Sequence, residues 1–296
     1  MKSFDNIKIK STQIYFIIVF SVLLLYVHNG YFDILEAKRK VLMWSVFFYT
    51  VIMLMVMILE IGYGKRHFRD ILHGLNRLDY CLLGFAAISI ISGFISDTPN
   101  TAFWGSESCG IGSFIICLLC ISCVMMSKYL RLSKWMISIL LFSGIIVCIG
   151  CITDCFDIDI MGWHQNIAAS HYDYLTTVGN RDVLDGFFAL LLPFVAVLFV
   201  FENNLLMKIL YTLFLFFGFM GLYIAKNDGN LLVFGSGIFL VYYILREKIE
   251  IKRVIYLIFI FIISSIAIQI ICIHVDPVNV TGNTIMGLFL RLNGYY

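Results

Sequence analysis

Nine runs of apolar residues, each bounded by charges or turn-forming residues, dominate the sequence. A helix that crosses a bilayer needs about 20 apolar residues, with a range of roughly 17 to 25. The runs are continuously apolar, whereas the strands of a membrane barrel alternate, so we predict helices. The predicted spans are residues 13–28, 41–60, 79–95, 112–127, 135–152, 185–201, 205–225, 230–245 and 254–274.

The composition points to the same class of protein. Hydrophobic residues make up 61% of the 296 residues and charged residues 14%, compared with about 25% charged residues in a soluble domain. The net charge of +2, without a basic stripe that carries aromatic residues, argues against a nucleic-acid partner. We therefore predict an all-α, polytopic integral membrane protein of about nine transmembrane helices, surrounded by membrane lipid and forming a single membrane domain over residues 1–296.

The lysines and arginines predict the orientation, because short cytoplasmic loops retain them. With the N-terminus inside, fifteen of the 21 cations fall in cytoplasmic segments and six in outer segments. This distribution predicts a cytoplasmic N-terminus. The first predicted outer loop is the one local exception, since it holds Lys38, Arg39 and Lys40.

The cysteines are the first candidates for a metal or redox site. Cys117, Cys120 and Cys123 have a spacing found in metal sites, as do Cys148 and Cys151. All five lie in apolar runs with no ligating histidine nearby in the sequence, so we predict that they pack as small apolar side chains and bind no metal. A further pair, Cys109 and Cys155, lies in polar loops and could form a disulfide.

The polar stretch 177–185 leads directly into an apolar run and carries the only cation of a long, mostly anionic outer loop, Arg181. A guanidinium gives bidentate donors to phosphate oxygens, and Arg181 follows Asn180 at a predicted helix entry, where backbone N–H groups add donors. We identify Arg181 and Asn180 as a candidate anion site. The alternative is an interfacial arginine that pairs with Asp182 or Asp185.

Four other residues of the predicted outer loops are further candidates. Lys226 lies in a tight turn and could bind phosphate as a point charge, although Asp-Gly is also ordinary turn chemistry. Trp104 could stack on a sugar ring, but tryptophan more often anchors helices at the membrane interface. His164 could act as a base or hold sugar hydroxyls, roles that a surface histidine usually lacks. Asp97 is a further candidate for substrate contact.

Three short motifs follow one another between residues 79 and 245. They are Ile95-Ser-Asp-Thr-Pro-Asn-Thr-Ala-Phe-Trp-Gly105 followed by Gly112, Thr177-Val-Gly-Asn-Arg-Asp182 followed by Phe187-Phe-Ala-Leu-Leu-Leu-Pro193, and Tyr223-Ile-Ala-Lys-Asn-Asp-Gly-Asn230. Their order resembles the O-antigen ligase and O-antigen polymerase family of bacterial envelope proteins. Cys109 and Asp228 depart from the pattern, because many members of the family carry an arginine at the first position and the ligases carry one at the second.

The resemblance implies a glycosyltransferase that transfers or polymerises an undecaprenyl-diphosphate-linked glycan, such as an O-antigen or another surface polysaccharide. The reaction would take place on the outer face of the bacterial cytoplasmic membrane, without a nucleotide, metal or other cofactor. The family's large outer loop, which contributes catalytic groups, begins where this sequence ends, so the chain resembles a truncated member and no catalytic residue is predicted. The residues assigned to the substrate are Arg181, Asn180, Lys226, Trp104, Asp97 and His164.

Two other functions stay open. A transporter or flippase for a lipid-linked glycan would carry charged groups midway along several spans, whereas the polar groups here gather in outer loops. A catalytically inactive partner in envelope assembly would fit the two missing arginines and the short C-terminal region.

Overall fold

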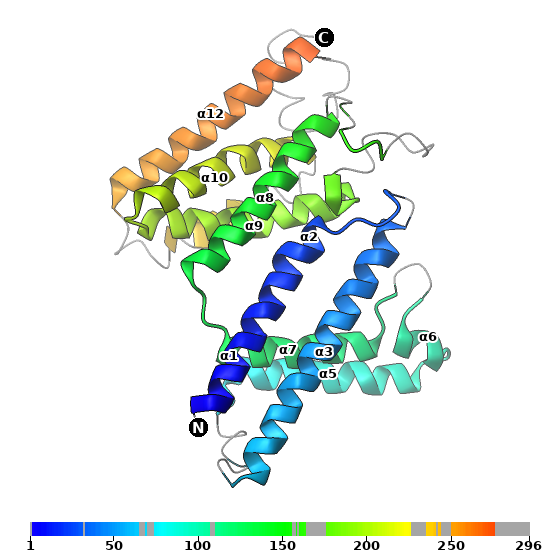
Figure 1. Cartoon of the computed structure of the whole chain (residues 1–296). Coiled ribbons are helices and arrows are strands. Elements are labelled where there is room, and N and C mark those ends of the chain that lie inside the picture. The colour runs from blue at the N-terminus through cyan, green and yellow to red at the C-terminus, as the bar shows by residue number, and fades with distance from the viewer. Residues whose placement is uncertain are drawn as a thin grey trace. The chain divides into compact units, whose positions relative to one another are not determined.

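The chain is an all-α, multi-pass membrane protein. Every regular element that its computed structural model describes is helical, as the continuously apolar runs predict (Figure 1). Seven of these helices are long and apolar enough to cross a membrane. The structure describes residues 2–31, 33–64, 69, 74–106, 110–155, 158, 160–163, 176–225, 235–240, 242–243 and 250–275.

The helices follow the predicted spans, and most of them extend beyond the apolar runs. The first span consists of α1 (Lys2–Ile17), a π-helical stretch (Ile18–Val22) and α2 (Leu23–Leu25). The others are α3 (Ile34–Gly62), α5 (Arg77–Ile95), α6 (Pro99–Trp104), α7 (Ser113–Tyr129), α8 (Lys134–Cys155), α9 (Arg181–Phe201), α10 (Leu205–Ala225) and α12 (Ile251–Val275).

The count of nine spans is not confirmed. Helix α7 has 17 residues, which gives it a length of about 26 Å, short of the roughly 30 Å hydrocarbon core of a bilayer. The predicted span 230–245 lies partly outside the described residues, although residues 235–240 and 242–243 are helical.

Two compact units make up the chain. The first comprises Met1–Leu23 and Leu35–Ile137, and the second comprises Leu24–Ile34 and Ser138–Tyr296. Buried apolar side chains occur in both. The prediction of one membrane domain over residues 1–296 stays a prediction.

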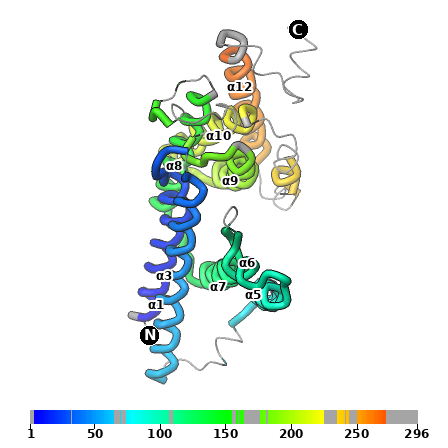
Figure 2. Tube along the Cα trace, turned by 90° about the vertical axis from the view of Figure 1, so that its right-hand side faces the viewer, coloured from blue at the N-terminus to red at the C-terminus, as the bar shows by residue number. Residues whose placement is uncertain are grey.

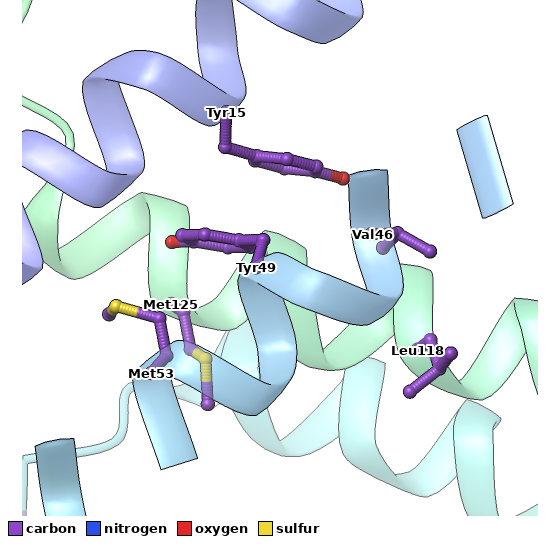
Figure 3. Close-up of a cluster of buried hydrophobic side chains, with 6 residues drawn as sticks. All are labelled: Tyr15, Val46, Tyr49, Met53, Leu118 and Met125. Carbon is purple, nitrogen blue, oxygen red and sulfur yellow. The ribbon is translucent and has the colours of Figure 1, made fainter. Parts of the chain in front are cut away.

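In the first unit, α1, α3 and α7 meet around two tyrosines (Figure 3). The rings of Tyr15 and Tyr49 stack with their centroids 4.2 Å apart. Their hydroxyl groups are bonded as well, that of Tyr15 to the Ser122 hydroxyl at 3.2 Å and that of Tyr49 to the Thr12 hydroxyl at 2.9 Å. The tyrosines thus bury a large apolar surface without leaving a polar atom unpaired. The other buried members of this cluster are Val46, Met53, Leu118 and Met125.

Helix α5 packs beside α7 in the same unit (Figure 2), and a capping box fixes its first turn. The Asn76 side chain accepts the Asp79 N–H, and the Asp79 carboxylate accepts the Asn76 N–H, both at 2.8 Å. The same carboxylate binds the Lys128 ammonium of α7 at 2.9 Å and the Ser127 hydroxyl at 3.3 Å. Asp79 is 1% exposed, so these bonds replace the water that its charge has lost.

A buried ion pair joins the start of α1 to the end of α3. The Nζ of Lys8 lies 2.7 Å from Oε2 of Glu60, and the two side chains are 0% and 4% exposed. The Asp5 carboxylate at 3.4 Å and the Tyr129 ring, centred 4.9 Å from Nζ, complete the surroundings of the ammonium. A buried charge is costly unless it is paired and hydrogen-bonded, so these contacts let a lysine occupy an apolar unit.

In the second unit, α9 and α10 approach closely because glycines of α10 admit large side chains of α9. A Cβ added at Gly221 would lie 2.5 Å from Cζ of Phe188, and one added at Gly218 would lie 2.7 Å from Cδ2 of Leu192. Both α9 side chains are fully buried. Dense packing of this kind holds membrane helices together, since lipid gives no hydrophobic reason for two apolar helices to associate.

Helix α12 packs against α10 and is tied to the α9–α10 connection. The Ser265 hydroxyl of α12 donates to the Tyr223 hydroxyl of α10 at 2.7 Å. The Arg253 guanidinium, near the start of α12, donates to the Val200 carbonyl and, at 3.1 Å, to the Asn203 side-chain oxygen. Three helices of the second unit are therefore linked by polar contacts.

Removing one partner of the Lys8–Glu60 pair should destabilise the protein far more than replacing both. Lys8→Met leaves the Glu60 carboxylate buried without its ammonium and is expected to lower the free energy of unfolding by about 3 to 5 kcal/mol. The double variant Lys8→Met/Glu60→Leu should recover most of this loss. Denaturation in detergent micelles measures both, with Lys10→Met, at an exposed position of the same helix, as the control. Equal losses in the single and the double variant would contradict a paired role.

Adding one methyl group at the α9–α10 contact should also be costly. Gly221→Ala forces the Phe188 ring to move within a packed interface, and we expect a loss of about 1 to 3 kcal/mol. Gly84→Ala in α5 is the matched control, because nothing lies within 4 Å of an added Cβ there. That control should stabilise its helix by about 0.5 to 1 kcal/mol. A Gly221 variant as stable as the wild type would mean that the two helices are not close-packed.

Candidate functional site at the entrance to α9

The polar stretch 177–185 leads into α9, as the sequence predicts. The helix begins at Arg181, before the apolar run predicted as span 185–201. Asn180 is its N-cap, and the Asn180 side-chain oxygen accepts the N–H groups of Asp182 at 2.8 Å and Val183 at 3.2 Å. The Leu184 N–H bonds to the Asn180 carbonyl at 3.0 Å. Three of the first four amides of α9 are therefore already bonded within the chain.

A buried carboxylate anchors the turn before this helix. Asp154, in the last turn of α8, is 8% exposed, and its Oδ2 accepts the Thr176 N–H at 2.5 Å. The Tyr31 hydroxyl donates to the same oxygen at 3.4 Å. Two donors on one oxygen offset much of the cost of burying the carboxylate. The end of α8 and the entrance to α9 are thereby joined.

The turn itself, Thr176–Val178, is strained at its first residue. Thr176 has φ +53°, in the left-handed region that β-branched residues rarely adopt. The bond to Asp154 holds the Thr176 amide, and the Thr177 hydroxyl donates to the Leu24 carbonyl at 2.9 Å. Strain of this kind persists only where the surrounding structure fixes it, and it is concentrated at functional sites.

Residues of the Leu24–Ile34 segment pack against the entrance. Gly179, with φ +81°, lies so close to Ile34 that an added Cβ would be 2.6 Å from its Cδ1. The Tyr31 ring meets Trp163 edge-on, with the centroids 5.7 Å apart. Glycine is therefore required at position 179 both for its backbone conformation and for this contact.

A second buried carboxylate, Asp185, lies in the first turns of α9. It is 0% exposed, as are its neighbours Leu184 and Phe188 on the inner face of the helix. An ionisable residue inside a membrane helix is rare and commonly marks a functional site. From the sequence, Asp185 is predicted only as an alternative partner for Arg181, and Asp154 is given no role. Asp185 is the first residue of the predicted run 185–201, and Asp154 follows the run 135–152 after Thr153. A carboxylate at the end of an apolar run was the signal that could have identified both.

The predicted site residues are divided between the two units. Asn180 and Arg181 adjoin in the second unit, and the Arg181 side chain lies outside what the structure describes. In the first unit, Trp104 ends α6, is 58% exposed and meets the rings of Phe103 and Phe114, while Asp97 is exposed just before α6. Residues 226 and 164, the predicted Lys226 and His164, lie outside the described residues.

No metal site is found within the described residues. They contain no group of three His, Cys, Asp or Glu side chains that could hold an ion. The six cysteines described there are free, and the side chains of Cys109 and Cys155 lie outside this part of the structure. The predictions that the chain uses no metal and no cofactor stay predictions.

Comparison of the chain with family models, with curated proteins and with solved structures found no match. The resemblance to the O-antigen ligase and polymerase family stays a prediction. What the fold defines is a class, that of multi-pass helical membrane proteins. Within that class, the entrance to α9 combines a strained turn, a capped helix start and two buried carboxylates.

The Asp154 anchor predicts how the entrance responds to mutation. Asp154→Ala removes the acceptor for the Thr176 N–H and should lower the free energy of unfolding by about 1 to 3 kcal/mol. Hydrogen exchange of the 176–184 backbone should accelerate, because the strained turn loses its support. Asp154→Asn, which keeps an acceptor oxygen, should retain part of the protection, and Asp182→Ala, at an exposed position, should change little beyond the first turn of α9. Unchanged exchange in Asp154→Ala would show that the carboxylate does not hold the turn.

Proposed function

We propose that the chain is a glycosyltransferase-like membrane protein that transfers or polymerises an undecaprenyl-diphosphate-linked glycan. The acting face would be the outer face of the bacterial cytoplasmic membrane, with the N-terminus in the cytoplasm. The observation that carries the proposal is the position of Arg181, which is the first residue of a membrane helix and follows a turn anchored by a buried carboxylate.

This position suits the diphosphate of a lipid-linked substrate. Such a substrate keeps its isoprenoid among apolar helices and its diphosphate at the membrane surface, where a helix start is also found. The positive end of the α9 dipole favours an anion there. Because three nearby amides are bonded within the chain, the clamp would rest on the guanidinium and the N–H of Arg181 itself. An arginine is the side chain that can supply bidentate bonds alone.

Asp154 would have a supporting part in this scheme. Glycosyl transfer to a hydroxyl needs a group that accepts the hydroxyl proton. One Asp154 oxygen already accepts the Thr176 N–H and the Tyr31 hydroxyl, and these bonds occupy that oxygen and fix its position. We therefore assign Asp154 to holding the entrance, and Lys226, Trp104, Asp97 and His164 stay proposed substrate contacts.

Transport of a lipid-linked glycan is a second candidate function, and one observation favours it. The structure buries the charged side chains of Lys8, Glu60 and Asp185 within helices that could span a membrane. Intramembrane charges of this kind occur along substrate and ion pathways in transporters. Glycosyl transfer leaves a covalently altered product and transport does not, so the two functions differ in a measurable way.

The Arg181 clamp predicts a graded loss of activity. Proteoliposomes that contain the full chain would be supplied with an undecaprenyl-diphosphate-linked oligosaccharide, and the products would be followed by mass spectrometry. We expect Arg181→Ala to slow transfer about a hundredfold, because a charge-assisted contact to the leaving diphosphate is lost. Arg181→Lys should keep part of the rate, since an ammonium retains the charge without the bidentate geometry.

The control is Arg131→Ala, which changes an exposed arginine in the connection between α7 and α8. Its transfer rate should equal that of the wild type. An Arg181→Ala variant as active as the wild type would refute the clamp. Movement of a fluorescent lipid-linked glycan across the bilayer without any covalent product would instead establish the transport function.

A further inference from the structure

The side chain of Arg39, in the second turn of α3, lies against the connection between α6 and α7. A Cβ added at Gly110 would overlap Nη1 of Arg39 and would lie 2.5 Å from its Cζ. The guanidinium therefore rests directly on the backbone, in space that any other residue at position 110 would fill. The Arg39 side chain is half-buried there.

Glycines shape the wall that faces this guanidinium. Gly105 has φ +95°, and a Cβ added to it would lie 2.5 Å from the carbonyl carbon of Gly110. A Cβ at Gly112 would overlap the Phe103 carbonyl oxygen. The backbone is thus folded tightly on itself beside Arg39. Glycines at such positions let main-chain groups come close to a ligand.

Helix α7 starts at the same place. Its N-cap is Gly112, which offers no side-chain bond to the first turn, and its first residue is Ser113. The Ser113 hydroxyl is buried and has no hydrogen-bond partner within the described residues, and it lies toward α5, where a Cβ added at Gly93 would be 2.5 Å from it. The first amides of a helix carry a partial positive charge and have no partner inside the helix. An uncapped helix start and a guanidinium therefore lie together.

Positive charge at this place is not balanced by a carboxylate in the described part of the chain. There, Lys40 pairs with Glu36 at 2.7 Å, and Lys38 donates to the Leu23 carbonyl at 2.6 Å. Arg39 makes no ion pair with any described residue, in contrast to the buried Lys8 and Asp79 of the same unit. A half-buried guanidinium that no described carboxylate pairs with is costly, and a bound anion would remove that cost.

We propose that Arg39 and the first turn of α7 bind a phosphate-type oxyanion. The fork of the guanidinium and the backbone N–H groups of a helix start are the donors that phosphate oxygens accept in proteins. The anion is the head group of an anionic lipid or a soluble phosphate compound, which share this chemistry. The site belongs to the first unit and does not involve Arg181, so it goes beyond the proposed function.

The test uses the full chain in phosphatidylcholine nanodiscs, titrated with inorganic pyrophosphate by calorimetry. A second arm uses nanodiscs that contain phosphatidylglycerol and counts retained lipid by native mass spectrometry. Saturable binding of pyrophosphate identifies a soluble ligand, whereas selective retention of phosphatidylglycerol identifies a head group. Either result supports the site provided that Arg39→Gln weakens it about tenfold or more, the effect of losing a charge-assisted contact.

Three comparisons make the result specific. Lys40→Gln removes a neighbouring, exposed charge and should leave binding unchanged, while Arg39→Lys should lose part of the affinity because the fork is gone. Gly110→Ala, which displaces the guanidinium, should weaken binding as well. Each variant is checked for wild-type thermal unfolding. Should Arg39→Gln not fold, Arg39→Lys decides the question, and its full retention of affinity would overturn the proposal.

A further variant tests whether the Arg39 site acts independently of Arg181. The effect of Arg39→Gln should persist in an Arg181→Ala background, so the two anion sites can fail independently. Binding of neither probe by the wild type, or equal binding by wild type and Arg39→Gln, overturns the proposal.

Discussion

In a bilayer, a polar group that the protein does not satisfy finds no water to replace the missing partner, and this constraint shapes both units of the structure. The apolar helices meet it through their own backbone bonds. The charged side chains that they bury meet it through designated partners: Lys8 has Glu60, Asp79 has Lys128, and Asp154 has the Thr176 amide. Each of these contacts joins two separate segments of the chain. The need to give each buried charged group a bonded partner therefore contributes to which segments of the chain contact each other.

Packing of apolar side chains also holds the helices of each unit together, and the two units are packed in different ways. The first unit places a stacked tyrosine pair, with both hydroxyl groups bonded, where three helices meet. The second unit brings α9 and α10 together by fitting Phe188 against Gly221. The second solution packs the two helices closely, because the glycine leaves room for the Phe188 ring.

Much of the architecture can be read from the sequence because a membrane helix must be apolar along its length. The runs 41–60 and 205–225 reappear within α3 and as α10. The predicted loop segment around Lys38, Arg39 and Lys40 is helical, because these residues lie in α3, which begins before the predicted span 41–60. Charge normally ends a predicted span, but a helix continues when its charged residues find partners, as Lys40 does with Glu36. The α9 entrance was predictable from Asn180 and Arg181, whereas the role of Asp154 depends on a contact with Thr176, and sequence spacing does not report such contacts.

The order in which the chain is synthesised determines when the Arg253 contacts can form. Helices α9 and α10 are separated by residues 202–204 and can pair as soon as both have emerged. Arg253, whose guanidinium bonds the Val200 carbonyl, is made 53 residues after Val200. At synthesis rates of about 5 to 20 residues per second this is a delay of about 3 to 10 s, long compared with the folding of a helical pair. The bond between Arg253 and the Val200 carbonyl, at the C-terminal end of α9, therefore forms only after α10 has been made and the start of α12 arrives.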